Sequence, residues 1–202
     1  MTPDGLAKLI RARADGPGRF LVALAGPPAS GKSTLAARLA ADLSPGARVV
    51  PMDGFHYDDA VLTARGLRAR KGSPPTFDAA GFVHLIRRLR TEDEVAIPIF
   101  DRSMELSRAA ADVVGPEDRI LIVEGNYLLL DQAPWNALPA LFDLTVFLDV
   151  PEAELVRRLT ARWRDHGKDD AAARDWIASN DLPNALTVIR ESRPAEIVLR
   201  GV

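Results

Sequence analysis

The sequence predicts an α/β fold in which helices cover both faces of a parallel sheet. Two observations support this prediction. Aliphatic runs of strand length alternate with segments of helical spacing, and the first such run leads directly into a glycine-rich loop and a helix. Because right-handed crossovers join parallel strands, ligands are expected at the carboxyl ends of the strands.

The elements follow from local patterns. A leading helix is expected within residues 1–16, because Leu6, Leu9 and Ile10 have helical spacing and a glycine- and proline-containing turn follows. A single domain with its core at 19–202 is expected from the length. Strands are predicted at 20–25, 48–52, 119–124, 144–148 and 197–199, with a further apolar segment at 95–100. Helices are predicted after the glycine-rich loop, after Asp78 as N-cap, at 107–111 and at 152–164. The polar stretch 54–76 is predicted to be a functional loop.

Composition narrows the class of partner. The 202 residues carry a net charge of -2 and no cysteine, which gives no support for a nucleic-acid partner and excludes disulfides. No apolar stretch has the length of a membrane span, and the first residues lack the apolar segment of a secretory signal. We therefore expect a cytoplasmic protein that acts on a small molecule. Its oligomeric state stays open, with a homodimer as one alternative.

Residues 26–34 read GPPASGKST and follow the predicted strand at 20–25. This spacing is typical of a phosphate-binding P-loop, or Walker A motif, whose backbone N–H groups surround phosphate oxygens at a helix start. Lys32 would reach the β- and γ-phosphates, and Ser33 a magnesium ion. The candidate nucleotide contacts are Gly26, Pro27, Pro28, Ala29, Ser30, Gly31, Lys32, Ser33 and Thr34.

Two carboxylates follow or end predicted strands at the same edge of the sheet. Asp53, in MDGFHYDD, could accept the proton of a bound hydroxyl, or it could cap a turn with Gly54. Glu124, in IVEGNYLL, occupies a position suited to magnesium or its waters, or it could simply face solvent. Asp53, Glu124 and Lys32 are the candidate catalytic residues, with Ser33 and Glu124 as metal ligands. The residues alone leave open which carboxylate is the base.

Several side chains could contact the phosphate acceptor. Arg70 and Lys71, in RKGSPPTFD, bring positive charge into the stretch 54–76, and Arg102 in IFDRS could join them, although a solvated loop would look the same. His56 and Tyr57 follow Asp53 closely and are further candidates.

The predicted helix at 152–164 carries Arg157, Arg158, Arg162 and Arg164. At least one of them could lie over the phosphates and stabilise the charge on the transferred group. We take Arg162 as the candidate.

The motifs together resemble one family of P-loop kinases. GPPASGKST, MDGFHYDD, RKGSPPTFD, IPIFDRS, VEGNYLLL and NDLPNA are similar to segments of the phosphoribulokinase, uridine kinase and bacterial pantothenate kinase family. The resemblance runs from about residue 20 to the end and is greatest to bacterial proteins named fructose transport system kinases. It implies a P-loop NTPase fold with a five-stranded parallel sheet, ATP and Mg²⁺ as cofactors, and a lid helix near 158–164. It also implies that Asp53 is the base, that Arg70 and Lys71 hold the substrate, and that the stretch 180–184, with Asn184, lies toward the nucleotide base.

The chain is therefore predicted to be an ATP-dependent kinase that phosphorylates an alcohol of a small acceptor. The acceptor could be a sugar such as fructose, a nucleoside or a pantothenate-like molecule. The alternative is a nucleotide-binding regulatory ATPase or switch that acts on a transport partner. No NKxD guanine-reading motif and no transporter-ATPase signature is present, which favours the kinase.

Overall fold

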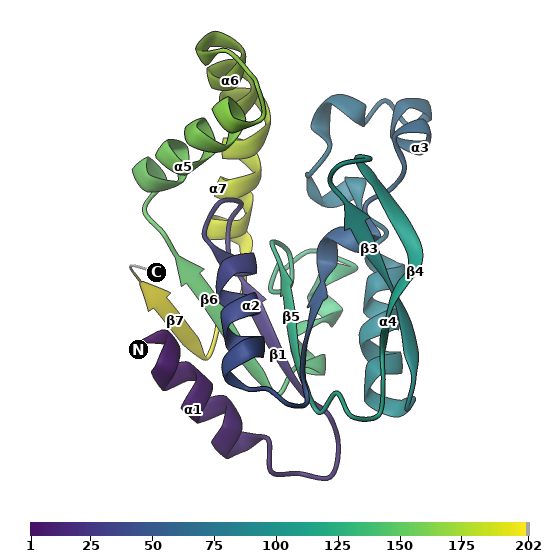
Figure 1. Ribbon diagram of the computed structural model, residues 1–202. Coiled ribbons are helices and arrows are strands. Elements are labelled where there is room, and N and C mark those ends of the chain that lie inside the picture. The colour runs from purple at the N-terminus through teal and green to yellow at the C-terminus, as the bar shows by residue number, and fades with distance from the viewer. Residues whose placement is uncertain (201–202) are drawn as a thin grey trace.

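A five-stranded parallel sheet forms the centre of the protein in the computed structural model, which describes residues 1–200 (Figure 1). The expected end of the core at residue 202 lies outside these described residues. The strand order is β2-β5-β1-β6-β7. The strands are β1 (Phe20–Ala25), β2 (Ala47–Pro51), β5 (Ile120–Gly125), β6 (Leu144–Asp149) and β7 (Ile197–Arg200). Because β1 pairs with β5 and β6, the loop that follows β1 leaves from the middle of the sheet.

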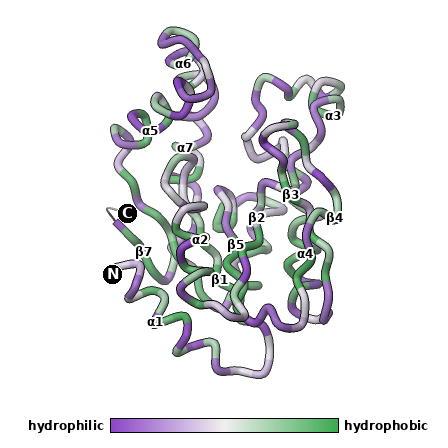
Figure 2. Tube along the Cα trace, viewed as in Figure 1, coloured by the Kyte–Doolittle hydropathy of each residue, from purple (hydrophilic) through white to green (hydrophobic). Residues whose placement is uncertain are grey.

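Helices cover both faces of the sheet, since successive residues of a strand point to opposite sides. On one face, Val22 and Leu24 belong to a buried cluster with residues of α1 (Pro3–Arg13) and α2 (Lys32–Asp42). On the other face, strand residues pack with α4 (Ala79–Thr91) and with the segment around Trp135. Figure 2 shows hydrophobic positions along the central strands and more hydrophilic ones toward α5 and α6. The predicted three-layer α/β fold is confirmed.

The predicted helix at 107–111 is wrong. These residues lie in β4 (Leu106–Val114), which pairs antiparallel with β3 (Val95–Asp101) in a separate two-stranded sheet. The alanines of this segment favour a helix locally, but pairing with β3 outweighs that preference. The register shifts between Ile97 and Ile99, where Pro98 has no N–H to donate, and Ala110 on the facing strand has a φ of 50°.

Two groups of short elements stand at the carboxyl end of the sheet, on opposite sides (Figure 1). The stretch 54–76, which the sequence predicts to be a loop, contains the helix α3 (Asp59–Ala64) between short 3₁₀ turns. Opposite lie α5 (Glu152–Asp165), α6 (Asp170–Trp176), a π-helical turn (Ile177–Asp181) and α7 (Leu182–Glu191). Among residues 1–200, no helix is both long enough and apolar enough to cross a bilayer.

Candidate active site

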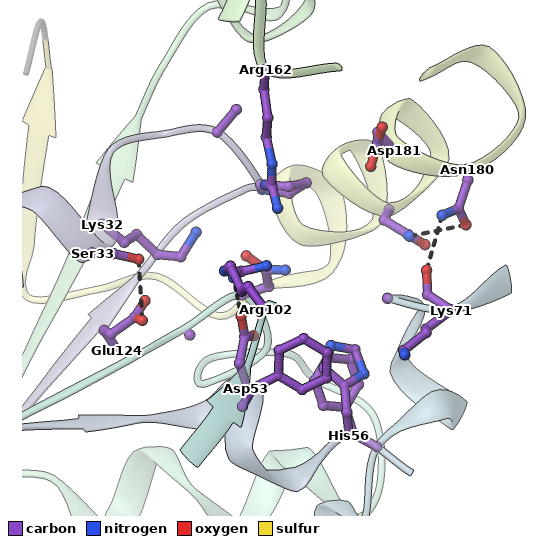
Figure 3. Close-up of a pocket in the computed structure, with 18 of the residues that line it drawn as sticks. Lys32, Ser33, Asp53, His56, Lys71, Arg102, Glu124, Arg162, Asn180 and Asp181 are labelled. Atoms are coloured by element: carbon purple, nitrogen blue, oxygen red, sulfur yellow. Dashed lines mark hydrogen bonds and ion pairs between the residues drawn. The ribbon is translucent and has the colours of Figure 1, made fainter. Parts of the chain in front are cut away.

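One cavity of about 510 Å³ lies at the carboxyl end of the sheet. The P-loop, the segment after β2, the β3–β4 hairpin and the helices from α5 to α7 all contribute to its walls. Figure 3 shows Arg162 reaching into it from the helical side, opposite Asp53, Arg102 and His56. Elements far apart in the sequence therefore meet around one space.

The P-loop forms one wall of the cavity. Gly31 has a φ of 94°, and no side chain caps α2, which starts at Lys32. The first-turn N–H groups of α2 are therefore available to phosphate oxygens. Lys32 is only 7% exposed, and its Nζ donates hydrogen bonds to the Pro27 carbonyl (2.8 Å) and to Ser30 Oγ (3.4 Å). Burial lowers the pKa of Lys32 to about 8, although Glu124 and Asp53 act in the opposite direction.

Ser33 and Glu124 form a pair that suits magnesium. Ser33 Oγ donates a hydrogen bond to Glu124 Oε1 at 3.2 Å, and Glu124 is 9% exposed. Burial raises the pKa of Glu124, an effect that Lys32 partly opposes. Among residues 1–200, no cluster of three or more histidine, aspartate or glutamate side chains could hold a metal alone. A hydroxyl and one carboxylate beside a phosphate-binding loop nevertheless match the usual magnesium environment in such proteins, in which phosphates and waters complete the ligand set. The residues present therefore fit the ion.

Asp53 lines the cavity from the segment after β2. It lies in the 3₁₀ turn Met52–Phe55, directly after β2, which neighbours the strand of Glu124. Asp53 Oδ2 accepts a hydrogen bond from Arg102 Nη2 at 2.7 Å. This contact depends on Gly54, because a Cβ atom there would come within 2.2 Å of the Pro98 carbonyl oxygen in β3. The glycine lets the hairpin approach the turn closely enough for Arg102 to reach Asp53.

His56 and Lys71 are two further wall residues. His56 stacks on Phe77 with ring centroids 3.9 Å apart, and burial lowers the pKa of His56 to about 4. The Lys71 side chain is 8% exposed, and its Nζ lies 2.7 Å from Asp59 and 3.3 Å from Glu105. Both residues line the cavity together with Asp53 and Arg102.

The structure separates the four arginines of α5. Arg157 pairs with Glu154, and Arg164 pairs with Asp170, both at the surface. Arg158 and Arg162 line the cavity. Arg158 Nη1 donates a hydrogen bond to the Ser30 carbonyl at 3.2 Å, which ties α5 to the P-loop. Burial lowers the pKa of Arg162, and the nearby Arg102 adds to this effect.

Tyr57 and Arg70 do not line this cavity. The Arg65 guanidinium carbon lies over the Tyr57 ring, 4.4 Å from the centroid of that ring. Arg70 is exposed and lines a second cavity of about 270 Å³ with Ser73 and other residues. Asn184 is buried and lines both cavities, beside Gly72. The roles of these residues stay predictions.

Other wall residues were not anticipated from the sequence, and they include Arg68, Phe77, Phe100, Glu105, Asn126, Trp163 and Trp176. Asn180 and Asp181 also line the cavity and belong to the stretch 180–184, which the family resemblance places toward the nucleotide base. Trp163 Nε1 donates a hydrogen bond to Asp181 Oδ2 at 2.6 Å, and Asn180 Nδ2 donates one to the Lys71 carbonyl at 2.9 Å. Asn180 and Asp181 lie in the π-helical turn Ile177–Asp181, and π-helical turns are often found at functional sites. The NDLPNA motif was the sequence signal for this part of the wall.

Comparisons with known proteins agree with this geometry. The model of the family described as "Phosphoribulokinase / Uridine kinase family" matches residues 21–196. The crystal structure of a "putative fructose transport system kinase" from Silicibacter sp. TM1040 is 46% identical, with a TM-score of 0.94 over 98% of this chain and 99% of that chain. "Uncharacterized protein YggC" of Escherichia coli (strain K12) is 35% identical over 90% of this chain and 77% of that protein. "Putative uridine kinase C227.14" of Schizosaccharomyces pombe is 35% identical over 90% of this chain and 83% of that protein.

The family model covers the P-loop, the Asp53 segment, the hairpin and the helices that line the cavity. The resemblance found in the sequence motifs and the fold is thereby confirmed. The chain belongs to the phosphoribulokinase/uridine kinase family and is a P-loop phosphotransferase with an alcohol group as acceptor.

Proposed function

We propose that this protein transfers the γ-phosphoryl group of ATP to a hydroxyl of a small molecule such as a sugar, a nucleoside or a pantothenate-like compound. The position of Asp53 carries this proposal. Its carboxylate faces the same cavity as Lys32 and Glu124, at the end of the strand next to that of Glu124. A carboxylate in this place can receive a proton from a hydroxyl that lies between it and the phosphates.

On the nucleotide side, the N–H groups at the start of α2 and the Lys32 ammonium would bind the phosphates. Ser33 and Glu124 would hold Mg²⁺, which when bound neutralises charge on the β- and γ-phosphates. Arg162 extends into the cavity and would stabilise the charge on the equatorial oxygens of the transferred group.

On the acceptor side, Asp53 would accept the hydroxyl proton as the acceptor oxygen forms its bond to the γ-phosphorus. The bond between that phosphorus and the leaving oxygen of ADP breaks in the same step. Arg102 would hold the Asp53 carboxylate in place through their ion pair at 2.7 Å.

The test is acceptor-dependent release of ADP, measured with a panel of sugars, nucleosides and pantothenate in the presence of Mg²⁺. Lys32→Ala should abolish turnover, whereas Lys8→Ala, at an exposed position of α1, should leave it unchanged. Hydrolysis of ATP at a rate that no acceptor alters would contradict the proposal and favour a regulatory ATPase. We place the reaction in the cytoplasm, in agreement with the composition.

A further inference from the structure

The acceptor end of the cavity is balanced in charge. We define it by the lining residues Asp53, His56, Arg68, Lys71, Arg102 and Glu105, together with Asp59, which does not line the cavity but pairs with Arg68 and Lys71. Each of its cations already has a carboxylate partner. Arg102 pairs with Asp53 at 2.7 Å, Arg68 with Asp59 at 2.6 Å, and Lys71 with Asp59 at 2.7 Å and Glu105 at 3.3 Å. These three cations and three carboxylates sum to zero.

A bound anion would therefore meet no excess of positive charge at the acceptor end. It would have to displace a carboxylate or bring its own charge into a partly buried neutral environment, and either is costly. The P-loop side differs, because the N–H groups at the start of α2 join Lys32 and Arg162 there and suit a triphosphate. Arg158 also lines this side and pairs with Glu154 at 2.7 Å. Asp181, on the helical wall, adds a carboxyl group rather than a cation.

Among residues 1–200, two uncharged polar groups in the walls of this cavity have no hydrogen-bond partner. They are His56 Nδ1, in the acceptor end, and Trp176 Nε1, on the helical wall, and both atoms are buried. His56 is neutral at physiological pH, since burial lowers its pKa to about 4. An indole N–H can only donate, whereas one nitrogen of a neutral imidazole can accept. Hydroxyl groups would complement both, since a hydroxyl both donates and accepts.

Aromatic rings stand beside these polar groups. His56 lies between Phe77 and Phe100, with centroid distances of 3.9 Å and 5.1 Å. On the opposite wall, Trp163 and Trp176 are in edge contact with centroids 5.8 Å apart. Rings with a few directional polar groups are typical of sites for small organic ligands, and they can pack against the C–H face of a sugar or against a base.

We infer that the acceptor is an uncharged polyhydroxylated molecule, a free sugar or a nucleoside, and not a compound that carries phosphate or carboxylate. This inference rests on the proposed kinase function and narrows its acceptor. The shared chemistry is a ring or chain with several hydroxyl groups and no ionised group.

Matched pairs of acceptors test it with the wild-type protein. The pairs are D-fructose with its 1- and 6-phosphates, D-ribulose with its 5-phosphate, uridine with uridine 5′-monophosphate, glycerol with D-glycerate, and pantothenol with pantothenate. We expect kcat/KM to be about 10-fold or more higher for the uncharged member of each pair that reacts, because of the cost of burying a charge. The sugar and nucleoside pairs separate the two sources of such an acceptor.

A charge variant tests the cause of the preference. Glu105→Gln removes one carboxylate beside Lys71 and leaves the acceptor end with a net positive charge. We expect it to raise kcat/KM for anionic acceptors about 3- to 10-fold relative to the uncharged ones, as one uncompensated charge in a half-buried site would do. Glu117→Gln, at an exposed turn outside the cavity, is the matched control. An unchanged ratio in Glu105→Gln would count against the charge balance as the cause.

The outcomes separate this inference from the proposed function. Faster turnover of the anionic members, abolished by Asp53→Asn, would overturn the uncharged acceptor and leave the kinase assignment in place. No acceptor-dependent ADP release from any pair would overturn the proposed function, and the inference with it.

Discussion

Arg102 and Asp53 form an ion pair that joins the β3–β4 hairpin to the edge of the central sheet, with Arg102 Nη2 2.7 Å from Asp53 Oδ2. The Asp53 side chain is 28% exposed and that of Arg102 is 57% exposed, so both can be reached from the cavity. The Arg102 guanidinium donates a hydrogen bond to Oδ2 of Asp53, and a carboxylate has a second oxygen that can accept. That second oxygen can face an acceptor hydroxyl. The pair thus orients the carboxylate that we propose as the base.

Replacing this carboxylate should separate chemistry from binding. In Asp53→Asn, we expect kcat to fall about 100- to 10,000-fold, the usual contribution of a general base, while the affinity for ATP stays within a few-fold. Steady-state ADP release and titration with a non-hydrolysable ATP analogue measure the two quantities. Asp15→Asn, at an exposed loop position after α1, is the control. Full acceptor-dependent turnover in Asp53→Asn would exclude Asp53 as the base.

The affinity for ATP should depend on pH through Lys32. Burial lowers the pKa of Lys32 to about 8, and the negative phosphates of a bound nucleotide would raise it again. Above pH 8 the free protein has lost a proton that the complex retains, so the affinity should fall as pH rises, approaching about tenfold per pH unit. Titration with the ATP analogue from pH 7 to 9.5 measures this. Lys32→Met should bind more weakly and without this dependence, and a wild-type affinity that stays constant over the range would contradict the prediction.

The central strands β1 and β5 could be predicted from the sequence, because they are buried on both faces and read as continuous aliphatic runs. The strand at 120–125 is an example, with ILIV followed by Glu124 and Gly125. The hairpin strand β4 could not be predicted in the same way. Its SRAAAD segment has the local preference of a helix, and only pairing with β3 makes it a strand.

The place of a side chain in the cavity wall was predictable near the carboxyl ends of strands, as for Glu124 in β5 and Asp53 after β2, and at the end of the P-loop, as for Lys32. The helical wall was harder. No motif of the sequence marks Trp176. Trp163 has helical spacing with Leu155 and Leu159, and such an apolar stripe ordinarily indicates core. Trp163 instead contacts Asp181 and Trp176 across a turn, at the edge of the cavity. The position of Trp163 depends on how α5 packs against α6, and residue spacing does not encode this tertiary arrangement.

Stability toward acid should depend on His56. Its pKa is about 4 in the folded protein and about 6.5 in an unfolded chain, so the unfolded state binds more protons between these values. The free energy of unfolding should therefore fall as pH drops from 6.5 to 4, by about 2–3 kcal/mol from this group. Urea denaturation at several pH values measures it. His56→Phe should reduce the loss, whereas His84→Phe, at an exposed position of α4, should retain it. Equal losses in wild type and His56→Phe would contradict the assignment.

Asn180 connects the helical wall to the loop that carries Lys71. It is 3% exposed within the π-helical turn, and its Nδ2 donates a hydrogen bond to the Lys71 carbonyl at 2.9 Å. Because Lys71 lines the acceptor end and Asn180 belongs to the helices opposite the hairpin, this contact joins the two sides of the cavity. We call the part of the stretch 54–76 around Lys71 the acceptor loop. We therefore expect Asn180 to position this loop without taking part in nucleotide binding.

In Asn180→Ala, the Lys71 carbonyl loses this partner and the loop should sample other positions. We expect KM for the acceptor to rise about 5- to 10-fold, as the loss of roughly 1 kcal/mol of positioning would produce, with the affinity for ATP unchanged. Ser179→Ala, at an exposed position of the same π-helical turn, provides the matched control. A role confined to general stability would lower the unfolding free energy and leave both KM values as they are. An equal rise in KM for ATP and for the acceptor would show that the contact supports the whole cavity instead of the acceptor loop.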